Sequence, residues 1–371
     1  MFSELLKRAE DQLSRRLPFV IYRKPNSKLV KVILQRDNQL HHALDYTEKG
    51  FVFAPFDSAD PVVLIPLEEE LNAQFTTKKI PTFEVEKKLQ GNVREKKEHL
   101  ELVKHGVQYI QKGYLDKVVL SRKITIDCEE PPLKIFEKLI STYTDAFCYL
   151  WYHPKIGMWL GATPEILLRT ENNDLITMSL AGTQPFVPNK NPVWGQKEID
   201  EQLMVTNYIT NVLKGQVTKI RAHGVESVRA GNLWHLRTKI TAAYDNNLGQ
   251  VIKALHPTPA VCGMPLSVAQ DFIREHENYN REYYTGFLGE LNLEAVIERN
   301  SNGKNRETKS YGTIKPKTEL FVNLRCMQMV DGKILIYVGG GITKDSIPEN
   351  EWEETIVKSK TILGILAKNQ F

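Results

Sequence analysis

The chain has 371 residues, of which 42% are hydrophobic and 25% are charged, and its formal net charge is +4. These proportions are ordinary for a globular protein and provide enough apolar material for one large core or two smaller ones. The small positive balance comes without a lysine-rich tail or a basic stripe with interleaved aromatics. This argues against nucleic-acid binding and is compatible with a small anionic substrate.

The first part of the chain predicts a mixture of helix and strand. Apolar residues at helical spacing predict an amphipathic helix over residues 1–20, and short strands follow at 28–35 and 50–65. Residues 66–110 are highly charged and favour helix, with a solvated connector over 78–98 and a helix over 93–112.

From about residue 114 the pattern changes to frequent strands punctuated by glycine and proline. The predicted strands are 117–120, 148–152, 158–160, 166–169, 175–179, 285–298, 319–330 and 333–338, and the predicted helices are 194–214, 265–278 and 349–368. The polar, turn-rich residues 300–317 are typical of a long exposed hairpin loop. Many strands in hairpin order with a few long helices predict a mixed α/β (α+β) fold with large antiparallel sheets, and not a Rossmann fold.

The cysteine and hydropathy patterns indicate the cellular compartment in which the protein is expected. Cys128, Cys148, Cys262 and Cys326 are scattered without a CxxC pair, so we expect reduced thiols and neither a zinc site nor a disulfide framework. No run of about 18 apolar residues predicts a membrane span, and the first residues do not resemble a signal peptide. We therefore expect a cytoplasmic protein.

Three glutamates are candidate metal ligands. Glu201 lies in the predicted helix 194–214, whereas Glu351, Glu354 and Lys358 have i, i+3 and i+7 spacing and share one face of the last helix. Two carboxylates and an ammonium on one face could hold a divalent cation and an anion together, and oxygen ligands alone suit Mg²⁺. The alternative is a solvated, charged helix.

Two glycine-containing turns are candidate anion sites. Gly339, Gly340 and Gly341 follow an apolar strand, and Gly182 with Thr183 follows another. Glycine permits close backbone approach and leaves N–H groups free for an anion. A plain strand-end turn explains either segment equally well.

Lys117 and Glu165 are candidates for acid–base chemistry. Lys117 opens an apolar strand, where desolvation would lower the lysine pKa and make the amine usable as a base. Glu165 precedes another apolar strand, where burial would raise the carboxyl pKa and make it an acid. The alternatives are a lysine that reaches water and an exposed turn carboxylate.

Two further polar residues are candidates for substrate binding. Arg325 lies within the predicted strand 319–330 and needs an anionic partner, either a substrate carboxylate or a carboxylate of the protein. His235 is a candidate polar residue of the same site, with a hydrogen-bonded structural histidine as the alternative.

Nine blocks occur in a fixed order along the last two thirds of the chain. They are DKVVLSR (116–122), GATPEILLR (161–169), LAGTQP (180–185), KEIDEQLMV (197–205), WHLRT (234–238), HPTPAVCGMP (256–265), REYYTGFLGE (281–290), NLRC (323–326) and YVGGGITKDSIPENEWEETIVK (337–358). In this order they resemble the chorismate-utilising enzymes, which include isochorismate, salicylate, anthranilate and aminodeoxychorismate synthases.

The resemblance implies a fold and a division of the chain. The expected fold has large antiparallel sheets packed as a sandwich with flanking helices. Residues 101–371 would form the chorismate-binding catalytic domain, and residues 1–100 would be an N-terminal part that completes the same fold. We expect a monomer whose only partner is the small-molecule substrate.

The resemblance also implies residue roles in a Mg²⁺-dependent site for chorismate, a cyclic dianion. Glu201, Glu351 and Glu354 resemble the metal-site glutamates. The ring carboxylate would bind at Gly182 and Thr183, and the enolpyruvyl carboxylate near Arg325, Tyr284 and the Gly339–Gly341 loop. Lys358 resembles the lysine near the metal and carboxylate.

Two positions indicate the reaction. Members that use water resemble this chain in having lysine at position 117, and the alanine at Ala181 stands where aminodeoxychorismate synthases usually have a nucleophilic lysine. The resemblance therefore implies isochorismate synthase activity: Lys117 deprotonates a water that adds at C2, and Glu165 protonates the departing C4 hydroxyl. Opposed pKa shifts would let one pocket carry both roles.

Two alternatives stay open. A salicylate synthase would also eliminate pyruvate, and the pocket-wall residues are mixed: Ala260 and Val261 favour isochorismate synthases, whereas Tyr284 and Leu324 occur in both. A chorismate-binding protein without activity is the other alternative. Isochorismate supplies menaquinone, siderophore and salicylate routes, among which the sequence does not choose.

Overall fold

The computed structural model describes residues 1–76, 92–171, 173–230, 233–245, 247–297 and 313–366. Most of the predicted connector 78–98 and most of the predicted hairpin loop 300–317 lie outside these residues. None of the described helices combines the length and apolarity needed to span a bilayer.

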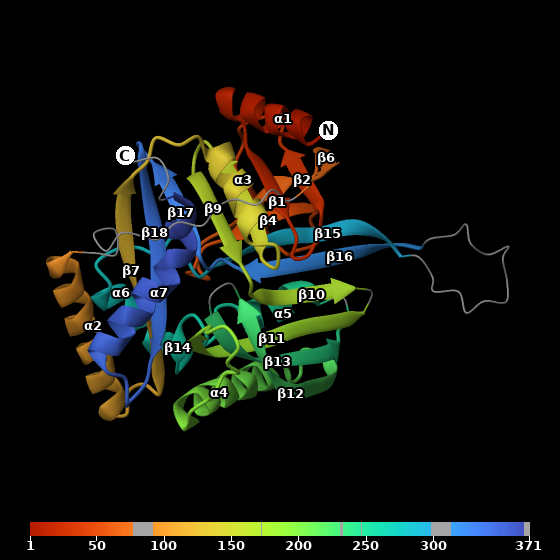
Figure 1. Cartoon of the computed structure of the whole chain (residues 1–371). Coiled ribbons are helices and arrows are strands. Elements are labelled where there is room, and N and C mark those ends of the chain that lie inside the picture. Colours follow the sequence, from red (N-terminus) through yellow and green to blue (C-terminus); the bar gives the residue numbers. More distant parts are fainter. Residues whose placement is uncertain (77–91, 172, 231–232, 246, 298–312, 367–371) are drawn as a thin grey trace.

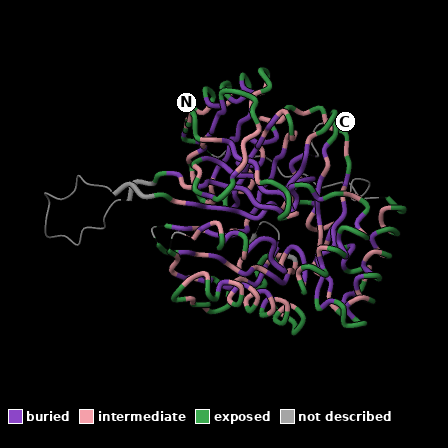
Figure 2. Tube along the Cα trace, turned by 180° about the vertical axis from the view of Figure 1, so that it is seen from behind, coloured by how far each residue is buried: buried purple, intermediate pink, exposed green. Residues whose placement is uncertain are grey.

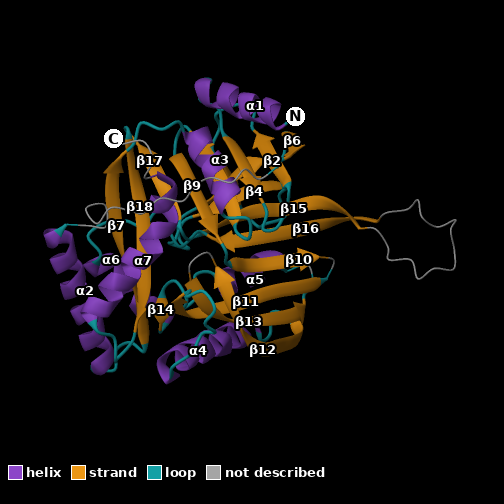
Figure 3. Ribbon diagram, in the orientation of Figure 1, coloured by secondary structure: helices purple, strands orange, loops and turns teal. Residues whose placement is uncertain are grey.

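Two nine-stranded sheets, with antiparallel pairing throughout, form the centre of the molecule (Figure 3). Sheet A contains, in spatial order, β14 (Gly263–Met264), β7 (Lys117–Asp127), β18 (Lys333–Ile342), β17 (Cys326–Val330), β9 (Gly157–Thr163), β8 (Phe147–His153), β1 (Phe19–Arg23), β2 (Leu29–Leu34) and β6 (Glu69–Gln74). Sheet B contains β12 (Thr218–Ala230), β13 (Leu233–Ala243), β11 (Asp174–Pro185), β10 (Ile166–Glu171), β16 (Thr313–Val322), β15 (Phe287–Ile297), β4 (Gly50–Ala54), β5 (Val62–Pro66) and β3 (His41–Ala43). The predicted α+β class with large antiparallel sheets is confirmed.

The sheets are buried on both faces because their strands are apolar on both sides. In β1, Phe19 and Ile21 belong to the core on the outer face of sheet A, whereas Val20 and Tyr22 face sheet B. This alternation follows from the two-residue period of a strand. A central core between the sheets and one core on each outer face result, and Figure 2 shows the buried segments concentrated there.

Helices cover the outer faces (Figure 1). Sheet A is covered by α1 (Phe2–Ser14), α3 (Pro132–Thr142) and α7 (Pro348–Leu366), and sheet B by α4 (Gln196–Leu213) and α5 (Leu248–Leu255). Helices α2 (Val93–Gln111) and α6 (Leu266–His276) pack beside β7 around a smaller core. Strands from residues 1–76 belong to both sheets, where they pair with later strands: β1 pairs with β8, and β4 with β15.

Two predictions in the first part of the chain are wrong. The helix predicted over 1–20 ends at Ser14, and β1 begins at Phe19, because Pro18 disfavours helical geometry in the residue before it. Residues 69–74, predicted to favour helix, form strand β6 at the edge of sheet A. There Leu71 and Ala73 turn inward and the charged and amide side chains alternate outward.

The single strand predicted over 319–330 is two strands in different sheets. β16 ends at Val322 and β17 begins at Cys326, and Arg325 between them has a left-handed φ of 48°. Most L residues avoid this conformation, which here turns the chain from sheet B to sheet A. The break places Arg325 at the junction of the two sheets.

Phe53 tests the central core. Its ring lies within 4.3 Å of the Tyr283 ring centroid and 4.9 Å of that of Trp151, and the side chain is fully buried. Phe53→Ala should lower the free energy of unfolding by about 3–5 kcal/mol, because a large cavity would open between the sheets. Urea unfolding measures the change; Leu44→Ala, at an 81% exposed position, is the control and should change it by less than about 0.5 kcal/mol.

Candidate active site

A cavity lies where the two sheets meet the first turns of α4 and α7. Its wall includes residues of β11, β13, β18, α4 and α7 and of the connecting segments around 165, 260, 284 and 325. Of the sequence-predicted site residues it contains Glu165, Gly182, Thr183, Glu201, His235, Tyr284, Arg325, Gly339, Gly340, Glu354 and Lys358. Lys117 and Glu351 are not part of the wall, but both contact residues that are, as described below. Residues as far apart in the sequence as Val119 and Ile362 thus line one cavity.

Glu165 is a buried carboxyl at the turn between β9 and β10. Its backbone carbonyl accepts a hydrogen bond from Val322 N at 2.9 Å, which fixes the turn against β16. Burial raises the pKa of Glu165 to about 7, although the positive charges of Arg325, Lys117 and Lys358 act in the opposite direction. The side chain can therefore carry a proton near neutral pH and donate it inside the cavity.

Lys117 lies directly behind the cavity wall. Its side chain is 1% exposed, and Nζ is 2.6 Å from Glu201 Oε1. A Cβ built on Gly341, which lines the cavity, would lie 3.4 Å from this Nζ and 2.7 Å from Glu201 Oε1. Only glycine at 341 gives the amine and the carboxylate this close approach to the backbone.

Each of the three predicted metal-site glutamates is paired with a lysine. Besides the Lys117–Glu201 pair, Lys358 Nζ lies 2.7 Å from Glu354 Oε1 and Lys197 Nζ lies 3.1 Å from Glu351 Oε1. The pKa of Glu201 is lowered: burial alone would raise it, but the charge of Lys117, its hydrogen bond and the charges of Lys358 and Lys197 together outweigh burial. The pKa of Glu351 is raised, first by burial and then by the neighbouring charge of Glu354.

The carboxylates converge on the glycine strand of β18. A Cβ on Gly340 would lie 3.4 Å from Glu354 Oε1 and 3.5 Å from Glu351 Oε2, and Glu201 stands over Gly341. Within the described part of the chain, no three acidic, histidine or cysteine side chains are already arranged as a metal cluster. The carboxylate oxygens nevertheless suit a hard divalent cation, and such a cation would relieve the repulsion between Glu351 and Glu354. The paired lysines occupy the space beside these carboxylates.

Gly182 and Thr183 lie on the opposite sheet. The register between β11 and β13 shifts between Ala181 and Thr183, and Gly182 has a φ of 66°. A Cβ at this position would come within 3.1 Å of Glu198 Cβ, so glycine also allows the first turn of α4 to approach β11. The bulge directs the Thr183 hydroxyl toward His235 Nδ1, at 3.3 Å.

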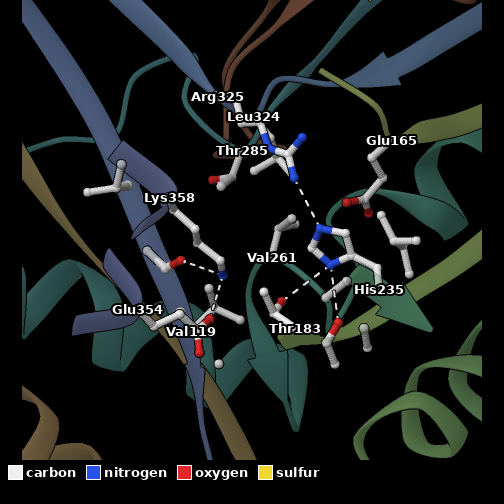
Figure 4. A pocket seen from close by; sticks show the side chains of 18 of the residues that line it. Val119, Glu165, Thr183, His235, Val261, Thr285, Leu324, Arg325, Glu354 and Lys358 are labelled. Carbon is white, nitrogen blue, oxygen red and sulfur yellow. Dashed lines mark hydrogen bonds and ion pairs between the residues drawn. The ribbon is translucent and has the colours of Figure 1, made fainter. Parts of the chain in front are cut away.

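His235 connects the two ends of the cavity (Figure 4). Its Nδ1 is 3.1 Å from Gly182 O, and its Nε2 is 3.0 Å from Arg325 Nη2. Burial, followed by the charges of Arg325 and Lys358, lowers the His235 pKa to about 3, so the ring is neutral. Because a guanidinium only donates, Nε2 accepts from Arg325 and Nδ1–H donates to the Gly182 carbonyl. The ring thereby orients Arg325, whose guanidinium faces the cavity.

Aromatic residues close the wall beside the glycine strand. Tyr284 stacks on Tyr337 with ring centroids 5.4 Å apart, and both rings line the cavity. A planar, apolar wall next to Arg325 and Lys358 suits an unsaturated ring that carries carboxylates.

Three further residues of the cavity wall were not predicted as site residues: Lys197, Glu198 and Tyr337. Lys197 and Glu198 precede Glu201 by four and three positions on α4, so helical spacing from Glu201 would have found them. The Glu198 carboxylate accepts a hydrogen bond from Gly195 N at 3.0 Å, which caps the first turn of α4. No local signal marked Tyr337, which reads as an ordinary strand residue.

Comparison with known proteins places these features in one family. Models described as chorismate binding enzyme match residues 62–298 and 310–364. Isochorismate synthase EntC of Escherichia coli (strain K12) is 29% identical over 266 residues, which cover 68% of this chain and 62% of that enzyme. The chain thus accounts for less than two thirds of that relative's length.

Solved structures share the fold. A putative 2,3-dihydroxybenzoate-specific isochorismate synthase, DhbC from Bacillus anthracis, superposes with a TM-score of 0.77 at 22% identity, covering 95% of this chain and 97% of the other. MenF, the menaquinone-specific isochorismate synthase from Escherichia coli, gives 0.74 at 20% identity, with coverages of 94% and 88%. At these identities the likeness concerns the fold.

The raised pKa of Glu165 predicts a pH-dependent contribution to stability. Because the folded-state pKa is about 7 and the ordinary value is 4.5, the contribution is full below pH about 4.5 and is lost as pH rises to about 7. Relative to Glu165→Gln, the wild-type protein should lose about 3 kcal/mol of unfolding free energy between pH 4.5 and pH 7. Urea unfolding of both proteins across this range measures the difference; a constant difference would contradict the assignment.

Proposed function

The chain belongs to the chorismate binding enzyme family, and on this premise we propose that it is a magnesium-dependent isochorismate synthase. The observation that carries the proposal is one cavity in which a buried, protonatable Glu165 lies across from Lys358 and Glu354 (Figure 4), with the Lys117–Glu201 pair at its wall. An acid and a basic side chain in one enclosed space are what water addition with loss of hydroxide requires.

The charges of the cavity favour a dianionic substrate. Arg325 offers a guanidinium at one end, and Lys358 offers an ammonium near the glycine strand. We assign the enolpyruvyl carboxylate of chorismate to the neighbourhood of Arg325 and Tyr284, and the ring carboxylate to Gly182, Thr183 and the glutamates. Arg325 is well suited to this task because His235 holds its orientation and a guanidinium can bind a carboxylate through two hydrogen bonds.

Glu201, Glu351 and Glu354 would hold the magnesium ion. When bound there, Mg²⁺ would neutralise the ring carboxylate and make the conjugated ring more electrophilic. The carboxylates supply oxygen ligands from α4 and α7, which lie against opposite sheets. This ligand set is supported by the convergence of the three carboxylates over Gly340 and Gly341.

The reaction moves one proton at each end of the ring. Lys117 Nζ accepts a proton from water as the water oxygen bonds to C2, the ring double bond shifts, and the C4–O bond breaks. Glu165 donates its proton to the departing hydroxyl, which leaves as water. Because Lys117 is paired with Glu201 and an amine accepts a proton only when it is neutral, Lys117 must first give a proton to solvent and leave that carboxylate before it can act as a base.

We further propose that residues 1–100 complete the fold around the catalytic part, residues 101–371. The pairing of β1 with β8 and of β4 with β15 supports this division, because the early strands make up one end of each sheet and extend it beyond the later strands. An isolated 101–371 fragment would expose the apolar faces that β1 and β4 cover.

Turnover of chorismate tests the function. With Mg²⁺, the purified protein should convert chorismate to isochorismate, and a chelator should abolish conversion. Chromatography of the products separates the alternatives: salicylate with pyruvate would indicate a salicylate synthase, and unchanged chorismate would indicate a binding protein.

Lys117→Ala tests the base. Loss of the amine should lower kcat by about 10²- to 10⁴-fold. Chorismate should still bind, because Lys117 lies behind the cavity wall at Gly341. Stopped assays give kcat, and calorimetry with chorismate gives the binding constant. Lys333→Ala, at an exposed lysine that opens the neighbouring strand β18, is the matched control; near-normal turnover by Lys117→Ala would refute the assignment.

Glu165→Gln tests the acid. In the wild type, kcat/KM should fall as pH rises above about 7, where Glu165 loses the proton that it must donate. The amide cannot donate in the same way, so the variant should be about 10²- to 10⁴-fold slower and should lack this limb. Initial rates from pH 6 to pH 9 measure both features, and an unchanged alkaline limb in the variant would exclude Glu165 as its source.

A further inference from the structure

The three lysine–glutamate pairs of the cavity differ in how firmly the lysine is held. Lys117 is 1% exposed, and Lys358 donates a second hydrogen bond, to Gly339 O at 3.0 Å. The Lys197 side chain is 38% exposed, and among the described residues Glu351 is its only hydrogen-bond or ion-pair partner. The Lys197 ammonium can therefore reach solvent once another cation compensates the buried Glu351, whereas the Lys117 ammonium is enclosed.

The Lys197 ammonium occupies a position that favours positive charge. Burial alone would lower its pKa, but Glu351, Glu354 and Glu201 together outweigh burial and raise the pKa. All three glutamates thus act on this one ammonium, although it is bonded to Glu351 alone. A divalent cation bound by the same carboxylates carries twice the charge and would be attracted more strongly than the ammonium.

The pair also connects the two halves of the site. Lys197 lies in the first turn of α4, which packs on sheet B, and Glu351 lies in the first turns of α7, which packs on sheet A. Glu351 is almost fully buried beside Glu354, and among the described residues Lys197 is the ion-pair partner of Glu351, whereas Glu354 is paired with Lys358.

We propose that Lys197 is a displaceable internal cation: its ammonium holds the carboxylates of α4 and α7 in place in the metal-free protein, and Mg²⁺ expels it from Glu351 on binding. This inference rests on the metal site of the proposed function. It makes Lys197 a positioning residue that competes with the metal, in contrast to a ligand or a substrate-binding group.

The competition fixes the sign of a mutational effect. Removing the charge of Lys197 while keeping its hydrocarbon stem should make Mg²⁺ bind more tightly, because no ammonium must be displaced. It should also make the metal-free protein less stable, because the buried Glu351 then lacks its counter-ion beside Glu354. A merely structural role would weaken metal binding, since a loosened site binds less well.

Mg²⁺ titration without chorismate measures the effect. By calorimetry, Lys197→Met should lower the Mg²⁺ Kd by about threefold to tenfold relative to wild type, the range expected for loss of one half-exposed competing ion pair. Lys197→Arg, which keeps the charge, should restore a Kd near the wild-type value. Lys214→Met, next to the far end of α4, is the matched control and should leave the Kd unchanged.

Thermal unfolding with and without Mg²⁺ supplies the second readout. Lys197→Met should melt below wild type in chelator and show a larger upward Tm shift on adding Mg²⁺. An unchanged or weaker Mg²⁺ affinity in Lys197→Met would overturn the proposal. A raised KM for chorismate at unchanged Mg²⁺ affinity would also overturn it, and would assign Lys197 to the substrate.

A wild-type experiment keeps the test independent of any variant's folding. In protein labelled with ¹⁵N at lysine side chains, the Lys197 ammonium signal should be present in chelator and disappear on saturation with Mg²⁺; persistence would contradict displacement. The Mg²⁺ titration, the thermal unfolding and the NMR experiment contain no chorismate. Tighter Mg²⁺ binding by Lys197→Met in a protein that does not convert chorismate would therefore remove the proposed reaction and leave this inference standing.

Discussion

The cavity depends on like charges held close together at the junction of two sheets. Burial and then the neighbouring charge of Glu354 raise the Glu351 pKa, and Glu201 approaches the same glycine strand from α4. Buried carboxylates persist only when opposite charges compensate them, and here each has a lysine within 3.1 Å. The lysines thus keep the site assembled and at the same time occupy the space that a metal ion would use.

Glu165, on the other side of the cavity, differs from these paired carboxylates. Among the described residues Glu165 has positive charges nearby but no ion-pair partner, so burial dominates and its pKa rises. Glu201 is equally enclosed, but its contact with Lys117 and the charges of Lys358 and Lys197 together outweigh burial and lower its pKa. The pKa values of two glutamates in one cavity are therefore shifted in opposite directions by the charges around each of them.

Backbone geometry brings these groups together. Sheet A supplies Lys117 and the glycine strand, sheet B supplies Thr183 and His235, and Arg325 lies where the chain crosses between them. Because the cavity is made from both sheets, its shape depends on the packing of the aromatic core that holds them together. The same arrangement explains why solved structures at about 20% identity retain the fold over almost the whole chain.

The sequence by itself determined the fold class, most of the strands and helices after residue 114, and the family. Strong two-residue and helical periodicities mark those elements, and nine ordered blocks mark the family. It also identified most of the polar residues that line the cavity, because each lies in one of those blocks or at a turn, but not Lys197 or Glu198. Two of its errors, the helix that ends at Ser14 instead of residue 20 and the single strand over 319–330, fall where one proline or one left-handed residue changes the chain direction. A third is the helical preference over residues 69–74, which form strand β6.

Only the tertiary structure decided how these residues act on one another. The pairing of Lys117 with Glu201, the neutral tautomer of His235 and the role of Lys197 at Glu351 join residues 84, 53 and 154 positions apart. Local sequence encodes secondary structure through backbone preferences, but pKa values depend on burial and on charges a few ångströms away. Those neighbours are fixed by the packing of the two sheets, which no single segment of the chain specifies.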